Sequence, residues 1–232
     1  MKSGLFITGT DTNAGKTWAT LTLMHLLQQQ NYCVVGMKPV ASGCLWQQDQ
    51  WRNADALALQ QASSIALSYE LVNPYAYELP VSPDIAGNHN PVDVDVIKQR
   101  YQSLQSVADL VLVEGAGGWL SPINAKQSMS DLALALQLPV LLVVALRLGC
   151  INHASLSLSA IKQSGLACLG WLAVSVDPDM VCPEQTLDVL KTRLNAEFLG
   201  LLPYQTQADY EQLACSVDLN ALCQQLSIDS IV

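Results

Sequence analysis

Charged side chains are scarce in this sequence. They make up 13% of its 232 residues, and only 11 of them are lysine or arginine. Against 20 acidic residues, this leaves a net charge of −9. A surface of that sign repels nucleic acid and anionic lipid, because both are negative themselves. The composition therefore argues against nucleic-acid and membrane partners, and any anion site must be built locally from backbone N–H groups and a few placed lysines.

Histidine is also scarce, and paired cysteines are missing. Three histidines and seven scattered cysteines without a CxxC pair offer neither a local zinc spacing nor a disulfide framework. We interpret the thiols as small core residues in a reducing cytosol. The longest apolar stretch, Leu138–Leu146, falls far short of the roughly 20 residues that a membrane-spanning helix needs. The first residues lack the features of a secretory signal, so we expect a cytoplasmic protein.

Half of the residues are hydrophobic, and short aliphatic runs alternate with longer helical patterns. Nearly continuous apolar runs are typical of parallel strands that are covered on both faces. This succession predicts a doubly wound α/β fold, with a mainly parallel sheet flanked by helices, in a single domain over residues 1–232. The expected strands are Leu5–Thr8, Tyr32–Met37, Leu110–Val113, Val140–Ala145, Gly170–Val176 and Phe198–Leu202. The expected helices include Lys16–Gln29, Val92–Ser106, Ile151–Gln163 and Pro183–Asn195, and the proline-rich stretch Val72–Pro91 is expected to be a loop.

A glycine-containing segment, GTDTNAGKT (Gly9–Thr17), follows the first expected strand and leads into the first expected helix. A strand, a loop with Gly-Lys-Thr and a helix form the context of a Walker A phosphate loop. The spacing is a variant, because Thr10 stands where the standard motif has its first glycine. Backbone N–H groups of such a loop converge on an anion. We expect Lys16 to reach the β- and γ-phosphates and Thr17 to ligate Mg²⁺; a capped helix after a glycine turn is the alternative.

Two further segments carry polar chemistry at the ends of expected strands, where open parallel sheets bind their ligands. KPVASG places Lys38 toward the same crevice as Gly15, although a lysine that simply reaches the surface is the alternative. EGAGGW places Glu114 after a buried strand, where P-loop proteins hold their metal-supporting carboxylate. Asp55 opens a helix, either as a carboxylate favoured by the helix dipole or as a second carboxylate of the Mg²⁺ site.

The segment RLGCINHA (Arg147–Ala154) follows the fourth expected strand and opens a helix. Its N–H groups offer another anion site, which suits a substrate carboxylate. Asn152 is either part of that site or a helix-start residue that satisfies local backbone groups. His153 is more typical of a structural residue than of a catalytic one.

These segments, in this order, resemble the dethiobiotin synthetase family of biotin-pathway P-loop enzymes. The resemblance rests on GTDTNAGKT, KPVASG, RNADALAL, NPYAYELPVSP, VEGAGGWLSP and LGCINHA, between Gly9 and Ala154, and is weaker beyond them. It implies that 7,8-diaminononanoate, CO₂ and ATP are converted into dethiobiotin, ADP and phosphate. One amine takes up CO₂ as a carbamate, the carbamate attacks the γ-phosphate, and the second amine displaces phosphate to close a ureido ring.

The resemblance also implies roles for individual residues. Lys38 matches the catalytic lysine and acts with Lys16, while Mg²⁺ is held by Thr17, Asp55 and Glu114. The other nucleotide contacts are Thr12, Asn13, Ala14, Gly15, Gly115, Ala116, Gly117, Val174, Ser175, Pro203, Tyr204 and Gln205. The carbamate or diamine contacts are Thr12 and Ser42. The family is a homodimer, and the substrate tail meets the neighbouring subunit at Gly149, Cys150, Ile151 and Asn152.

Two positions depart from the family pattern. Asn13 stands where some members have an acidic loop residue, and Val174 and Ser175 stand where an Asn-Asp pair often reads the adenine. A valine offers neither the donor nor the acceptor of an amide. We therefore predict weak discrimination between ATP and other triphosphates, or reading of the base by backbone groups near Pro203–Gln205.

Two other functions are compatible with a phosphate loop. A P-loop ligase or amidotransferase-type synthase normally adds a glutamine-hydrolysing domain, for which 232 residues leave no room unless a separate subunit supplies it. A partition-type ATPase switch carries an extra lysine early in the loop, where this chain has Thr10–Asn13, and binds DNA or membranes through basic surfaces. The stretch Val217–Leu226 contains no lysine or arginine, unlike a membrane-surface helix. Dethiobiotin synthesis is therefore the favoured function.

Overall fold

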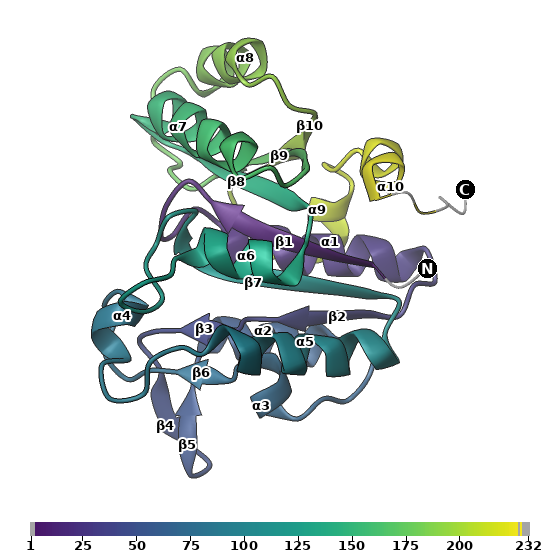
Figure 1. Cartoon of the computed structure of the whole chain (residues 1–232). Helices are drawn as coiled ribbons and strands as arrows, with labels where there is room; N and C mark the ends of the chain where they lie inside the picture. The colour runs from purple at the N-terminus through teal and green to yellow at the C-terminus, as the bar shows by residue number, and fades with distance from the viewer. Residues whose placement is uncertain (1–2, 227, 229–232) are drawn as a thin grey trace.

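The centre of the molecule is a six-stranded sheet in the order β10-β9-β8-β1-β7-β2, and every neighbouring pair is parallel (Figure 1). A computed structural model of the chain describes residues 3–226 and 228. The strands are β1 (Ser3–Gly9), β2 (Val34–Met37), β7 (Leu110–Gly118), β8 (Val140–Leu146), β9 (Cys168–Ser175) and β10 (Phe198–Leu202). The predicted doubly wound α/β fold with a mainly parallel sheet is confirmed.

Helices cover both faces of this sheet. Their bounds are α1 (Lys16–Gln29), α2 (Ala54–Ala62), α3 (Tyr69–Val72), α4 (Pro83–Ala86), α5 (Val94–Val107), α6 (Met129–Leu136), α7 (Cys150–Gln163), α8 (Pro183–Arg193), α9 (Tyr210–Ala214) and α10 (Leu219–Leu226). Helices α5 to α8 lie on one face of the sheet, and α1, α2, α9 and α10 lie on the other (Figure 1). Phe6 of β1 belongs to the core cluster on the first face, whereas its neighbours Leu5 and Ile7 belong to the cluster on the second. Because both faces are buried, the strands are apolar throughout instead of alternating.

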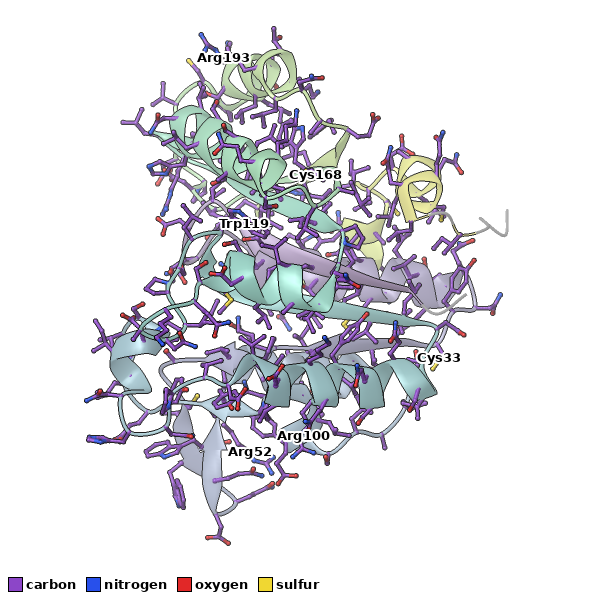
Figure 2. The ribbon with its side chains drawn as sticks, in the orientation of Figure 1. Cys33, Arg52, Arg100, Trp119, Cys168 and Arg193 are labelled. Carbon is purple, nitrogen blue, oxygen red and sulfur yellow. The ribbon has the colours of Figure 1, made fainter. Side chains whose placement is uncertain are left out.

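The main difference from the predicted elements is the length of β7. Its expected end at Val113 is wrong, because the strand continues beside β1, with Glu114 opposite Ile7 and Gly118 opposite Gly9. Beyond the strand lies Trp119, which is labelled in Figure 2. Its buried ring packs edge-on against Phe6, with ring centroids 6.2 Å apart. After Val113, β7 is therefore paired with β1 alone, since its pairing with β2 ends at Val113, and Glu114 lies inside the strand instead of after it.

Two small pairs of strands lie beside the main sheet. β3 (Val40–Ala41) pairs with β6 (Tyr75–Ala76), and β4 (Leu45–Gln47) forms a hairpin with β5 (Gln50–Arg52). β6 and α4 lie within the stretch that was expected to be a plain loop. Within residues 3–226 and 228, no helix combines the length and the apolar character that crossing a bilayer requires.

Candidate active site

The loop between β1 and α1 is shaped by backbone contacts. Gly15 caps α1 with a left-handed backbone, φ 85°, which glycine adopts without strain. A Cβ at this position would lie 2.7 Å from a methyl group of Val174, at the end of β9. The Lys16 ammonium folds back and donates to the carbonyl of Asp11 at 2.8 Å. The loop is thus closed around its lysine and packed against the end of β9.

Four side chains from four elements meet next to this loop. Lys38, which follows β2, donates to Oε1 of Glu114 at 2.5 Å and to Oδ2 of Asp55 at 3.1 Å. The Thr17 hydroxyl donates to the same Glu114 oxygen at 2.8 Å. Lys38 is 6% exposed and Glu114 is fully buried. The interpretation of Lys38 as a lysine that reaches the surface is therefore wrong.

The two lysines of the site have different electrostatic environments. Burial, and next the positive charge of Lys38, lower the pKa of Lys16 to about 8. Burial also disfavours the charge on Lys38, but the carboxylates of Glu114 and Asp55 outweigh this effect and raise its pKa. At neutral pH, Lys38 therefore stays positively charged, whereas the pKa of Lys16 lies only slightly above the pH of the solution.

These side chains open into a cleft of about 740 Å³. The predicted site residues that line it are Thr12, Asn13, Ala14, Gly15, Lys16, Thr17, Lys38, Ser42, Asp55, Glu114, Ala116, Gly117, Val174, Ser175, Tyr204 and Gln205. Gly115 and Pro203 are not part of this lining. A side chain at Gly115 would meet the ring of Phe6 at 3.3 Å, because alternate residues of β7 face opposite sides of the sheet.

The predicted substrate residues at the start of α7 do not line this cleft. Gly149 caps the helix with φ 94°, and Cys150 is buried at 2% exposure. Leu148, immediately before them, is 99% exposed. Arg147 donates to a carboxylate oxygen of Asp11 in the phosphate loop at 2.6 Å. An ion pair therefore connects the residue Arg147, just before α7, with the phosphate loop, whereas the first residues of α7 lie outside the cleft of their own chain.

Mg²⁺ fits the donor set at the cluster. Thr17, Asp55 and Glu114 offer hydroxyl and carboxylate oxygens, the ligand types that Mg²⁺ prefers. Oε2 of Glu114 is buried and has no hydrogen-bond partner, whereas buried polar atoms are normally paired. Among the described residues, no group of three or more His, Cys, Asp or Glu is placed so that it could hold a metal ion by itself. Such a donor set suits an ion that keeps waters and phosphate oxygens as further ligands.

The chain is similar to known proteins over most of its length. A protein-family model described as an AAA domain matches residues 3–212. The ATP-dependent dethiobiotin synthetase BioD of Xylella fastidiosa (strain 9a5c) is 47% identical over 204 residues, which cover 87% of this chain and 90% of that protein. The protein of the same name from Xanthomonas axonopodis pv. citri (strain 306) is 46% identical over 206 residues, 88% of this chain and 92% of that one. The chain belongs to the dethiobiotin synthetase family.

Solved structures from outside the dethiobiotin synthetase family share the fold of this chain. A ParA family ATPase from Chlorobium tepidum TLS matches with a TM-score of 0.56 and 14% identity, over 98% of this chain and 96% of that one. The signal recognition particle receptor FtsY from Elizabethkingia anophelis matches with 0.59 and 13%, over 97% of this chain and 65% of that one. At such identities, the likeness shows the P-loop NTPase fold alone.

The cleft of this dethiobiotin synthetase family member also has lining residues that sequence reasoning missed. They are Trp18, Ala41, Asn53, Pro80, Val81, Ser82, Pro83, Ser121 and Val176. The prolines lie in the segment NPYAYELPVSP, which the family resemblance had drawn attention to. Their composition indicates a loop, but no local pattern says that this loop folds back over the phosphate site.

Proposed function

We propose that this chain is an ATP-dependent dethiobiotin synthetase that acts on 7,8-diaminononanoate, CO₂ and ATP in the cytoplasm. One cluster supports this function above all: Lys38, Glu114 and Thr17 lie within hydrogen-bond distance beside the phosphate loop. It joins a fixed cation and a carboxylate to a nucleotide-binding loop. This combination suits phosphorylation of an anionic carbamate.

The proposed reaction has three steps. One amine of the substrate takes up CO₂ as a carbamate, and the carbamate oxygen attacks the γ-phosphate of ATP. The second amine then attacks the mixed anhydride, which expels phosphate and closes the ureido ring. Phosphoryl transfer depends on positioning and charge neutralisation more than on a protein nucleophile. Lys38 would stabilise the carbamate and its phosphorylated form, and Lys16 would neutralise charge on the γ-phosphoryl oxygens.

Bound Mg²⁺ would supply further positive charge to the transferring phosphoryl group. We assign Thr17, Asp55 and Glu114 to hold it. The unpaired Oε2 of Glu114 supports this assignment, because a buried carboxylate oxygen without a partner suits a metal or a water bound to it.

We further propose that the diamine or its carbamate contacts Ser42 and Thr12. The Ser42 hydroxyl is buried beside the cleft and has no hydrogen-bond partner, which suits an amine or carbamate ligand. Gly149–Asn152 would receive the substrate carboxylate of a neighbouring subunit in a homodimer.

A direct assay tests the function. The purified protein is incubated with 7,8-diaminononanoate, bicarbonate, Mg²⁺ and ATP, and dethiobiotin is sought by mass spectrometry. We expect dethiobiotin and ADP in equal amounts. A folded, nucleotide-binding protein that forms no dethiobiotin would refute the proposal. Amide formation on a carboxylate substrate would point to the amidotransferase-type synthase instead.

We expect weak selection of the nucleotide base. Val174 offers no hydrogen bond to a base edge, and both ends of the Gln205 amide are already paired, with Gln212 at 2.8 Å and Asp209 at 2.9 Å. Steady-state kcat/KM values for CTP, GTP and UTP should lie within about ten-fold of the value for ATP, which is the effect of roughly one neutral hydrogen bond. A strong ATP-only preference would contradict this expectation.

ADP binding should weaken as the pH rises through about 8, because Lys16 loses its proton there in the free protein. A phosphate anion favours the charged ammonium, so binding near this pH should take up protons, and affinity should fall by at most about ten-fold per pH unit above it. Calorimetry with EDTA, in buffers of different ionisation enthalpy, measures this uptake. Lys16→Arg, which stays charged, should bind without it; uptake that persists in this variant would rule out Lys16.

A further inference from the structure

A buried asparagine holds the main chain of Lys38. Asn73, directly after α3, is 3% exposed. Its Nδ2 donates to the carbonyl of Lys38 at 2.6 Å and to that of Tyr75 at 3.3 Å. The N–H of Lys38 donates to the carbonyl of Val72 at 2.9 Å. The peptide groups on both sides of the Lys38 side chain are therefore fixed by two consecutive residues.

The same asparagine is linked to the helix that carries Asp55. Oδ1 of Asn73 accepts from the Tyr69 hydroxyl at 2.8 Å, and this hydroxyl accepts from the N–H of Asn53 at 2.7 Å. Asn53 caps α2, and its side chain accepts from the N–H of Asp55 at 3.0 Å. One buried hydroxyl thus connects the backbone of Lys38 with the first turn of α2.

The Tyr69 hydroxyl is suited to this link. The side chain is 4% exposed, and burial raises the pKa of Tyr69 to about 12, so the hydroxyl keeps its proton and both donates and accepts. The guanidinium of Arg52, which is labelled in Figure 2, lies 5.1 Å from the centre of the ring. Ring and hydroxyl are therefore both held in place.

We infer that Asn73 and Tyr69 are positioning residues that set Lys38 against Asp55. Neither residue lines the cleft, so any effect on the reaction must pass through cleft residues that they hold: Lys38 directly and, by way of Asn53, Asp55. A lysine has a long, flexible side chain, and fixing its peptide groups and the helix of its partner limits where the ammonium can lie. This inference rests on the proposed function, in which Lys38 faces the carbamate and Asp55 belongs to the Mg²⁺ site.

Tyr69→Phe tests the link, because it removes the hydroxyl and keeps the ring. Tyr77→Phe is the matched control: Tyr77 is 6% exposed, and its hydroxyl donates to the carbonyl of Asn90 at 2.7 Å. Both variants should lose similar thermal stability. Only Tyr69→Phe should lower kcat, by about ten-fold, which is the lower end of the usual effect of a residue that orients catalytic side chains without touching the substrate. Its KM for ATP should stay within about two-fold of wild type.

A second readout does not depend on turnover. Calorimetry gives the factor by which Mg²⁺ strengthens ADP binding, and this factor should shrink in Tyr69→Phe but not in Tyr77→Phe. Asn73→Asp, which sets a carboxylate against the Lys38 carbonyl, should share the kcat defect. Unchanged kcat and Mg²⁺ factor in Tyr69→Phe, or equal losses in Tyr77→Phe, would overturn the inference. A wild-type protein that makes no dethiobiotin would refute the proposed function, and the Mg²⁺ factor would still test the link.

Discussion

Lys38→Ala should reduce dethiobiotin formation by about 100- to 1,000-fold, the usual effect of losing one preorganised charge at a reacting centre. ADP affinity should stay within a few-fold of wild type, because the phosphate loop and Lys16 remain. The measurement is single-turnover product formation beside calorimetric ADP binding. In the wild type, Glu114 and Asp55 keep the Lys38 ammonium charged. A change of pH near neutrality should therefore not cause the loss of activity that Lys38→Ala causes.

The substitution also leaves the fully buried Glu114 without its cation. Removing one partner of a buried ion pair typically costs about 3–5 kcal/mol of unfolding free energy, so denaturation must be measured alongside activity. Lys98→Ala, on the exposed surface of α5, is the control and should change neither quantity. Lys38→Arg keeps a positive charge and should recover stability more than rate. A stable Lys38→Ala variant with near-normal turnover would reject the catalytic role.

Glu114→Gln should lower kcat by about 100-fold and raise the Mg²⁺ concentration needed for half-maximal rate. Oε1 of this carboxylate accepts from both Thr17 and Lys38. A glutamine has nearly the same shape but no charge, so the lysine would keep only the half-exposed Asp55 as a counter-ion. Turnover as a function of Mg²⁺ concentration measures both effects.

Asp131→Asn is a useful control for Glu114→Gln. Asp131 completes the capping box of α6 with Ser128, so its replacement should cost stability without touching the cleft. If both variants lose activity in proportion to stability, Glu114 has no special role. Lys38→Ala and Glu114→Gln remove the same pair, so their effects on kcat should not add in the double variant. Additive losses would mean that the two side chains act separately.

The layout of the sheet could be predicted from the sequence because both of its faces are covered. Fully buried strands leave continuous apolar runs, and β10 was predicted with its observed bounds, Phe198–Leu202. The start of α1 at Lys16 was equally clear, since Gly15 must precede it in the phosphate loop. The end of β7 could not be predicted, because the glycines after Glu114 are typical of a loop and are held in the strand only by β1.

The charged cluster was predicted in part. Strand ends identified Lys38 and Glu114, because parallel strands bring their carboxyl ends to one edge. Whether Asp55 joins them depends on how α2 is placed, and a local sequence pattern carries no information about that; only the family resemblance assigned Asp55 to the Mg²⁺ site. The same holds for Asn73, which reaches the carbonyl of Lys38 across 35 residues of chain. Such contacts between distant segments leave no periodicity to detect.

The contact between Gly15 and Val174 has a consequence for engineering this protein. Val174 is 3% exposed, and its methyl groups fill the space that a side chain on Gly15 would need. A graft of an Asn-Asp pair at 174–175, intended to sharpen choice of base, would therefore also replace the support beneath the phosphate loop. Ser175 also lines the cleft and is the safer position to change first. A substitution at Val174 would alter base selection and the packing of the phosphate loop together.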